Sequence, residues 1–122
     1  MVRILPIPHD VNSSYLRGTA GGPPRILAQE HTGSANVYAE GGRAIRLNED
    51  YRVLPEIQVS GLQGDEAFTV IRDRVRHEMT QPDGSLFCFG GDHSITYPVL
   101  AGYAAVQQPL HVLQLDAHSD LY

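Results

Sequence analysis

The stretch LFCFGGDHS (residues 86–94) is an apolar run that ends in a polar cluster, and LQLDAHSD (residues 113–120) has the same form. Residues 86–89 place apolar side chains on both faces of an extended backbone, which is typical of a strand inside a parallel sheet. Residues 110–115 predict the next buried strand. Because ligands bind at the carboxyl ends of strands in open α/β sheets, we expect both polar clusters to lie at one edge of the sheet.

Helices are expected between these strands. The longest is predicted over residues 65–79, where charges cover one face and apolar residues recur at helical spacing. The recurring apolar residues are Phe68, Ile71, Val75 and Met79. Asp65 is the expected N-cap of this helix. Shorter helices are predicted over residues 25–31, directly after two prolines that suit a first turn, and over residues 98–107.

Two further strands are predicted, one over residues 2–7 and one over residues 57–59. Residues 36–47 contain a Gly-Gly pair between short apolar pairs and predict a small hairpin. The alternating order of strands and helices, with long crossovers, predicts parallel strands. The expected fold class is therefore α/β, a three-layer α/β/α sandwich with a mainly parallel sheet. It is expected to be incomplete, because no helix follows the last predicted strand to cover it.

The composition is that of a globular domain: 122 residues, of which 42% are hydrophobic and 19% are charged, with a net charge of -5. The mild acidity argues against a nucleic-acid partner. No apolar run is long enough to span a bilayer, and the start lacks the features of a signal peptide. A single cysteine, Cys88, cannot form an internal disulfide. These features predict a cytoplasmic protein that binds neither nucleic acid nor membrane.

The second polar cluster has the spacing of a metal site. In an extended backbone Asp116, His118 and Asp120 would share one face. Two carboxylates so close would repel one another unless a cation lay between them. A mixed set of carboxylates and imidazole suits Mn²⁺, with Zn²⁺ or Fe²⁺ as alternatives. His93, presented after two glycines, would add a second imidazole from the neighbouring strand end.

These motifs resemble those of a known family. GGDHS at residues 90–94, followed by DAHSD at residues 116–120, resembles the first two signature motifs of the ureohydrolases, which include arginases, agmatinases and formimidoylglutamases. The resemblance extends to YPVL at residues 97–100 and to the N-terminal segments SSYLRG (residues 13–18) and GPPRI (residues 22–26). It implies an arginase-like fold, with residues 1–122 as the N-terminal part of a single ureohydrolase domain.

The resemblance also implies a role for each residue of the site. His93 would bind one Mn²⁺, Asp116 would bridge two, His118 would bind the second and Asp120 the first. Asp92 would not bind metal but would orient a ligand. A hydroxide between the two metals would attack a guanidino or amidine carbon and release urea and an amine, as in an agmatinase. No catalytic residue besides that hydroxide is expected within the chain.

The resemblance implies that the site is only partly present. The family's third signature, with two further aspartate ligands, would lie beyond residue 122. The chain alone is therefore expected to be inactive, and the intact enzyme is expected to be a homo-oligomer acting on a small guanidino or amidine substrate. Two alternatives remain: a non-catalytic or partner-requiring half-domain, and a related zinc deacetylase-like hydrolase. Asp120 together with GGDHS favours the ureohydrolase.

Residues outside the two clusters are given simpler interpretations. The other histidines are interpreted as surface or loop residues: His9, His31, His77 and His111. Cys88 is interpreted as a core residue rather than a nucleophile. Residues 9–22 form a long polar loop, and such loops are often functional. Its Ser13, Ser14 and Arg17 either line a substrate entrance or lie in a solvated loop.

Overall fold

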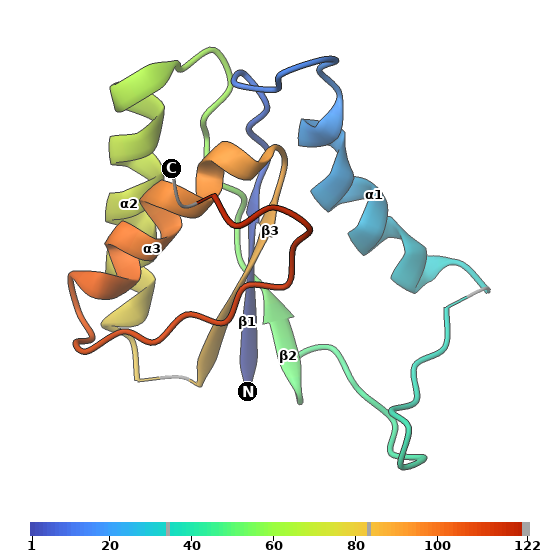
Figure 1. Cartoon of the computed structure of the whole chain (residues 1–122). Coiled ribbons are helices and arrows are strands. Elements are labelled where there is room, and N and C mark those ends of the chain that lie inside the picture. The colour runs from blue at the N-terminus through green and yellow to red at the C-terminus, as the bar shows by residue number, and fades with distance from the viewer. Residues whose placement is uncertain (34, 83, 121–122) are drawn as a thin grey trace.

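A three-stranded parallel sheet is the centre of the fold, in the order β2-β1-β3 (Figure 1). The computed structural model describes residues 1–33, 35–82 and 84–120. The strands are β1 (Val2–Ile7), β2 (Tyr51–Val53) and β3 (Ser85–Gly90). The register places Val2 opposite Ser85 and Ile7 opposite Gly90, so β1 and β3 end together. The parallel α/β class is confirmed, as are the strands predicted over residues 2–7 and 86–89.

Helices lie on both sides of the sheet, with α2 and α3 on one side and α1 on the other (Figure 1). They span Gly22–Ala28 (α1), Gly64–Met79 (α2) and Thr96–Ala104 (α3). Single turns of 3-10 helix occur at Thr19–Gly21 (η1), Gln29–His31 (η2) and His93–Ile95 (η3). The prediction of Asp65 as N-cap is wrong, because Gln63 precedes the helix. Asp65 lies instead in the first turn, where a carboxylate faces the positive end of the helix dipole.

The hydrophobic core lies between β1 and α2. Its buried members are Leu5, Ile7, Ile57, Val59, Ile71, Val75 and Ile95. Helix α3 packs closely on α2 at Gly102, where a Cβ atom would lie 2.8 Å from the backbone oxygen of Arg72. The core therefore fixes β1, and with it the neighbouring end of β3, against a rigid pair of helices.

The prediction of a strand over residues 57–59 is wrong. The second strand is β2, and after it Leu54 N donates to Ile4 O at 2.8 Å and Ile57 N to Pro6 O at 3.0 Å. Pro55 has no N–H to donate, so the ladder cannot continue regularly. Ile57 and Val59 nevertheless lie in the core, at 3% and 1% exposure. Their apolar pattern indicated burial correctly but not backbone conformation.

The prediction of a buried strand over residues 110–115 is also wrong for this chain. These residues form no strand, and Leu113 and Leu115 are 85% and 90% exposed. A strand with apolar side chains on both faces is stabilised only when layers cover both of them. Within the described residues, no layer covers the apolar side chains of this segment. Phe87 on the neighbouring strand β3 is itself 50% exposed.

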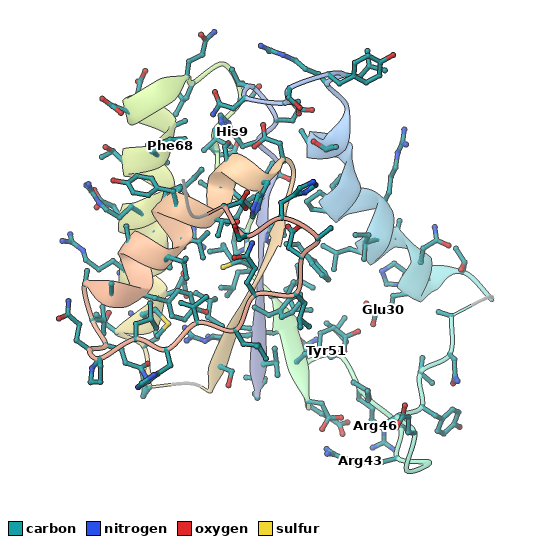
Figure 2. The ribbon with its side chains drawn as sticks, viewed as in Figure 1. His9, Glu30, Arg43, Arg46, Tyr51 and Phe68 are labelled. Carbon is teal, nitrogen blue, oxygen red and sulfur yellow. The ribbon has the colours of Figure 1, made fainter. Side chains whose placement is uncertain are left out.

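The hairpin predicted within residues 36–47 is confirmed as a single antiparallel bridge between Tyr38 and Ala44. A hydrogen bond joins the edge strand β2 to η2, where the hydroxyl of Tyr51 donates to the carboxylate of Glu30 (Figure 2). Burial of Tyr51 is the main cause that raises the pKa of this tyrosine to about 12, and the hydrogen bond to Glu30 is the second cause. This hydrogen bond and the hairpin both lie away from the polar edge of β3.

Candidate metal centre

The turn that follows β3 presents His93. Gly91 passes close to the end of β1, and Asp92 N donates to His9 O at 2.9 Å. The Asp92 carboxylate caps η3 by accepting from Ser94 N at 3.0 Å. It also accepts from Asn12 N at 3.0 Å. Asp92 therefore shapes the turn that carries His93, and no hydrogen bond to the imidazole is among its contacts.

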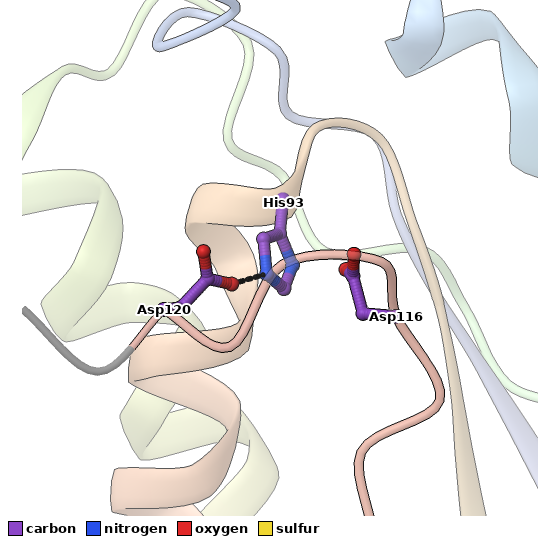
Figure 3. Close-up of side chains that lie close together, drawn as sticks. All are labelled: His93, Asp116 and Asp120. Atoms are coloured by element: carbon purple, nitrogen blue, oxygen red, sulfur yellow. Dashed lines mark hydrogen bonds and ion pairs between the residues drawn. The ribbon is translucent and has the colours of Figure 1, made fainter.

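Three of the four predicted ligands lie together (Figure 3). One ligand atom from each of His93, Asp116 and Asp120 lies within 4.8 Å of the other two. His93 Nε2 and Asp120 Oδ2 are 2.6 Å apart. One nitrogen and two carboxylate oxygens suit a fairly hard divalent cation such as Mn²⁺. All three side chains are exposed, so the cluster is open to solvent on this chain.

Asp116 is held ionised by its own turn. Its Oδ1 accepts from His118 N at 2.9 Å. This backbone hydrogen bond is the main cause that lowers the pKa of Asp116, and the charges of His118 and His93 act in the same direction. The lowered pKa extends toward lower pH the range over which Asp116 carries the negative charge that a cation binds.

The extended backbone expected for residues 116–120 is wrong. The hydrogen bond from His118 N to Asp116 curls the chain into a turn, and Asp120 has a φ of 52°. The His118 ring consequently lies outside the cluster, with Nδ1 3.7 Å from Asp116 Oδ1 and its side chain 77% exposed. The role of His118 as a metal ligand stays a prediction.

Thr96 orients the His93 ring, a contact that the sequence reasoning missed. Its Oγ1 lies 3.0 Å from His93 Nδ1, which leaves Nε2 facing Asp120. Metal-binding histidines commonly hydrogen-bond through their other ring nitrogen, and this fixes the tautomer and the ring orientation. The available signal was the spacing, since a residue three positions further along a helical segment lies on the same face.

Replacing Thr96 by valine should therefore weaken metal binding. Valine keeps the shape of threonine but cannot hydrogen-bond Nδ1, so the affinity for Mn²⁺ should fall by about 10- to 100-fold. Titration of the full-length protein with Mn²⁺, followed by electron paramagnetic resonance, measures this change. Thr96→Ser keeps the hydroxyl and should bind nearly as well as the wild type. Equal losses in the two variants would contradict the role of the hydroxyl.

A cavity of about 340 Å³ opens beside His93. Residues 10–20, within the long loop that follows β1, are called the 10–20 loop. This loop forms one wall of the cavity, and the turn after β3 forms the other. The lining residues are Asn12, Ser13, Ser14, Tyr15, Leu16, Asp92, His93 and Ser94. Of the two interpretations left open for Ser13 and Ser14, this geometry favours the substrate entrance. Arg17 is not among the lining residues and instead donates to Val11 O at 3.2 Å.

His9 and Cys88 lie outside the cluster. The interpretation of His9 as a surface or loop residue is wrong in its exposure: the side chain is 1% exposed and packs edge-on against Phe68 (Figure 2). Its burial therefore involves Phe68 in the N-terminal part of α2. Burial raises the pKa of the Cys88 thiol to about 12, which supports its interpretation as a core residue.

Comparison with known proteins identifies the family to which the chain belongs. The model of the Arginase family matches residues 1–122, the whole length of the chain. The chain belongs to the arginase family. It is 35% identical over 125 residues to "Arginase 1, mitochondrial" of Oryza sativa subsp. indica, covering 98% of this chain and 37% of that protein. The relationship to the ureohydrolases that the two sequence motifs predicted is thereby confirmed.

Other relatives agree with this placement. The chain is 30% identical over 121 residues to an N(1)-aminopropylagmatine ureohydrolase of Thermus thermophilus, covering 99% of this chain and 40% of that protein. The arginase from Medicago truncatula superposes with a TM-score of 0.76 at 25% identity, over 85% of this chain and 34% of that structure. The arginase-family chain thus spans well under half the length of these relatives.

Proposed function

We propose that the protein is a dinuclear manganese hydrolase that cleaves a C–N bond of a guanidino or amidine substrate, agmatinase-like, and releases urea and an amine. The observation that carries this proposal is the convergence of His93 with Asp116 and Asp120, whose ligand atoms lie within 4.8 Å of one another. These residues come from two segments more than twenty positions apart in sequence. Their convergence is what a shared cation would require.

The residues present fit two Mn²⁺ ions in part. His93 and Asp120 would hold one ion, Asp116 would bridge both, and His118 would hold the second after a change in its side-chain direction. When bound, two such ions lower the pKa of a shared water so that it becomes a nucleophile at neutral pH. The chain's own contribution is to orient the His93 ring through Thr96 and to keep Asp116 ionised.

The relatives support a guanidino substrate without choosing one. The names printed for them specify arginases and an N(1)-aminopropylagmatine ureohydrolase. The second of these names describes a substrate that ends in an amine rather than in an amino acid. Agmatine shares that property, whereas the arginases act on an amino acid, so the agmatinase-like substrate is the part of the proposal that a comparison of agmatine with arginine must test.

Residues 1–122 alone are proposed to be inactive. The three clustered ligands are exposed, and a pair of manganese ions needs more donors than these. The intact protein is proposed to supply the missing ligands and to be a homo-oligomer with no nucleic-acid or membrane partner. No helix among the described residues is long and apolar enough to cross a bilayer. A cytoplasmic location stays a prediction, because the names of several plant relatives refer to mitochondria or chloroplasts.

Metal analysis of the full-length protein tests the centre. Asp116→Ala removes the proposed bridging carboxylate and should lower the bound manganese from two ions per subunit to one or fewer, because both ions share that ligand. Glu40→Ala removes an exposed carboxylate from the 38–44 hairpin and should leave two. Unchanged manganese content in Asp116→Ala would contradict the proposal.

Urea release by the manganese-loaded wild type tests the reaction. We expect agmatine to be hydrolysed more efficiently than arginine. Activation by Zn²⁺ but not by Mn²⁺ would instead favour the deacetylase-like alternative.

A further inference from the structure

The long loop that follows β1 has a fixed shape. Asp10 Oδ2 accepts from two backbone amides across the loop, Gly18 N at 2.6 Å and Ala20 N at 3.1 Å. These hydrogen bonds, that of Gly18 first, lower the pKa of Asp10. Gly18 has a φ of 132°, a conformation that residues with a side chain rarely adopt. The loop is therefore closed on itself by a single carboxylate oxygen.

A second set of contacts joins this loop to the turn that carries His93. Asn12 donates through its backbone N–H to Asp92 Oδ2 at 3.0 Å and through Nδ2 to Ser94 Oγ at 3.1 Å. Residues 12–16 line the same 340 Å³ cavity as His93. A ligand that fills this cavity therefore contacts both the loop and the turn that carries His93.

The walls of the cavity have a definite chemistry. Residues 12–16 carry amide, hydroxyl, phenol and aliphatic side chains but no charge. Among the described residues that line the cavity, Asp92 is the acid and none is Lys or Arg. The charged carboxylate on these walls is negative and none of the described lining residues is Lys or Arg, so an ammonium group fits the cavity better than a second carboxylate does.

We propose that the 10–20 loop is the wall that recognises the end of the substrate away from its guanidinium group, that it selects an amine-ended chain, and that Asp10 is the positioning residue that holds it in shape. This proposal rests on the proposed function, because it takes the guanidinium group to lie at the His93 end. Asp10 does not line the cavity, so its effect is transmitted through the loop backbone.

Substitutions at Asp10 in the full-length, manganese-loaded protein test this inference. Asp10→Ala leaves two backbone amides without an acceptor, and the KM for agmatine should rise by about 10- to 100-fold with a smaller change in kcat. Asp10→Asn should restore the wild-type KM, because one amide oxygen can accept both hydrogen bonds. The affinity for Mn²⁺ should be the same in all three proteins.

Asp50→Ala is the matched control. Asp50 also closes a loop, by accepting from Arg46 N at 2.9 Å, but that loop does not line the cavity beside His93 (Figure 2 shows Arg46 far from His9). Its loss should leave the KM for agmatine unchanged. The wild type should also bind agmatine about tenfold or more tightly than 4-guanidinobutyrate, a chain of similar length that ends in a carboxylate.

The outcomes separate the two proposals. Urea release from agmatine with a KM that is equal in Asp10→Ala and the wild type would overturn the recognition wall and leave the enzyme assignment standing. Equal binding of agmatine and 4-guanidinobutyrate would overturn the selection of an amine. Absence of urea release from the wild type, with agmatine binding by saturation-transfer NMR that still depends on Asp10, would overturn the proposed reaction and support the wall as a binding site.

Discussion

Replacing Glu78 by alanine is expected to lower the free energy of unfolding by about 3–5 kcal/mol. Arg3 lies on β1 with 1% of its side chain exposed. Its guanidinium donates to Glu78 O at 2.8 Å and to Glu78 Oε2 at 3.2 Å. Arg74 donates to the other carboxylate oxygen at 2.8 Å. Removing the carboxylate leaves a buried positive charge without its counter-ion, and this costs more than an exposed ion pair contributes.

Urea denaturation monitored by circular dichroism measures this loss. Asp73→Ala on the same helix is the control, because its ion pair with Arg72 is exposed to solvent and should contribute little to stability. A second variant, Arg3→Met combined with Glu78→Leu, removes both charges and should recover much of the lost stability. If Glu78→Ala were no less stable than Asp73→Ala, the buried pair would not be what fixes β1 on α2.

Periodic signals in the sequence were sufficient for the central elements of the fold. β1, β3 and α2 lie where the apolar patterns predicted them, because each packs apolar residues against other elements of the described chain, β3 through the partly buried Leu86 and Cys88. The proximity of His93 and Asp120 was also predicted from the rule that functional groups gather at the carboxyl ends of strands, but only His93 follows a strand end, because no strand forms over residues 110–115. These inferences depended on features that a chain carries locally.

The incorrect predictions depended on contacts that no local pattern encodes. Residues 110–115 have the composition of a buried strand, but they lack a covering layer within the described chain. The turn at Asp116 depends on one side-chain hydrogen bond to His118 N, which competes with extended backbone. The burial of His9 depends on α2, whose Phe68 packs against the His9 ring from almost sixty residues away in sequence. Tertiary context decided the first and the third, and a local side-chain hydrogen bond decided the second.

Replacing Gly91 by alanine is expected to damage both stability and metal binding. A Cβ atom at this position would lie 2.1 Å from His9 O and 2.8 Å from His9 C. Both are backbone atoms, so no flexible side chain can move aside. Relief requires the ends of β1 and β3 to separate, at a cost of about 1–3 kcal/mol or more. Separation would also strain the hydrogen bond from Asp92 N to His9 O, which holds the turn carrying His93.

Stability and manganese affinity should therefore fall together in Gly91→Ala, with an affinity loss of about 10-fold or more as His93 moves away from Asp120. Gly41→Ala is the control, because a Cβ atom there meets nothing within 4 Å. Removing that glycine should leave stability equal or raise it by about 0.4–1 kcal/mol. Manganese affinity retained in a destabilised Gly91→Ala protein would mean that the cluster assembles without the close approach of β1 and β3. Asp116 and Asp120 would then have to position His93 through the bound ion, and the strand ends would serve only the fold.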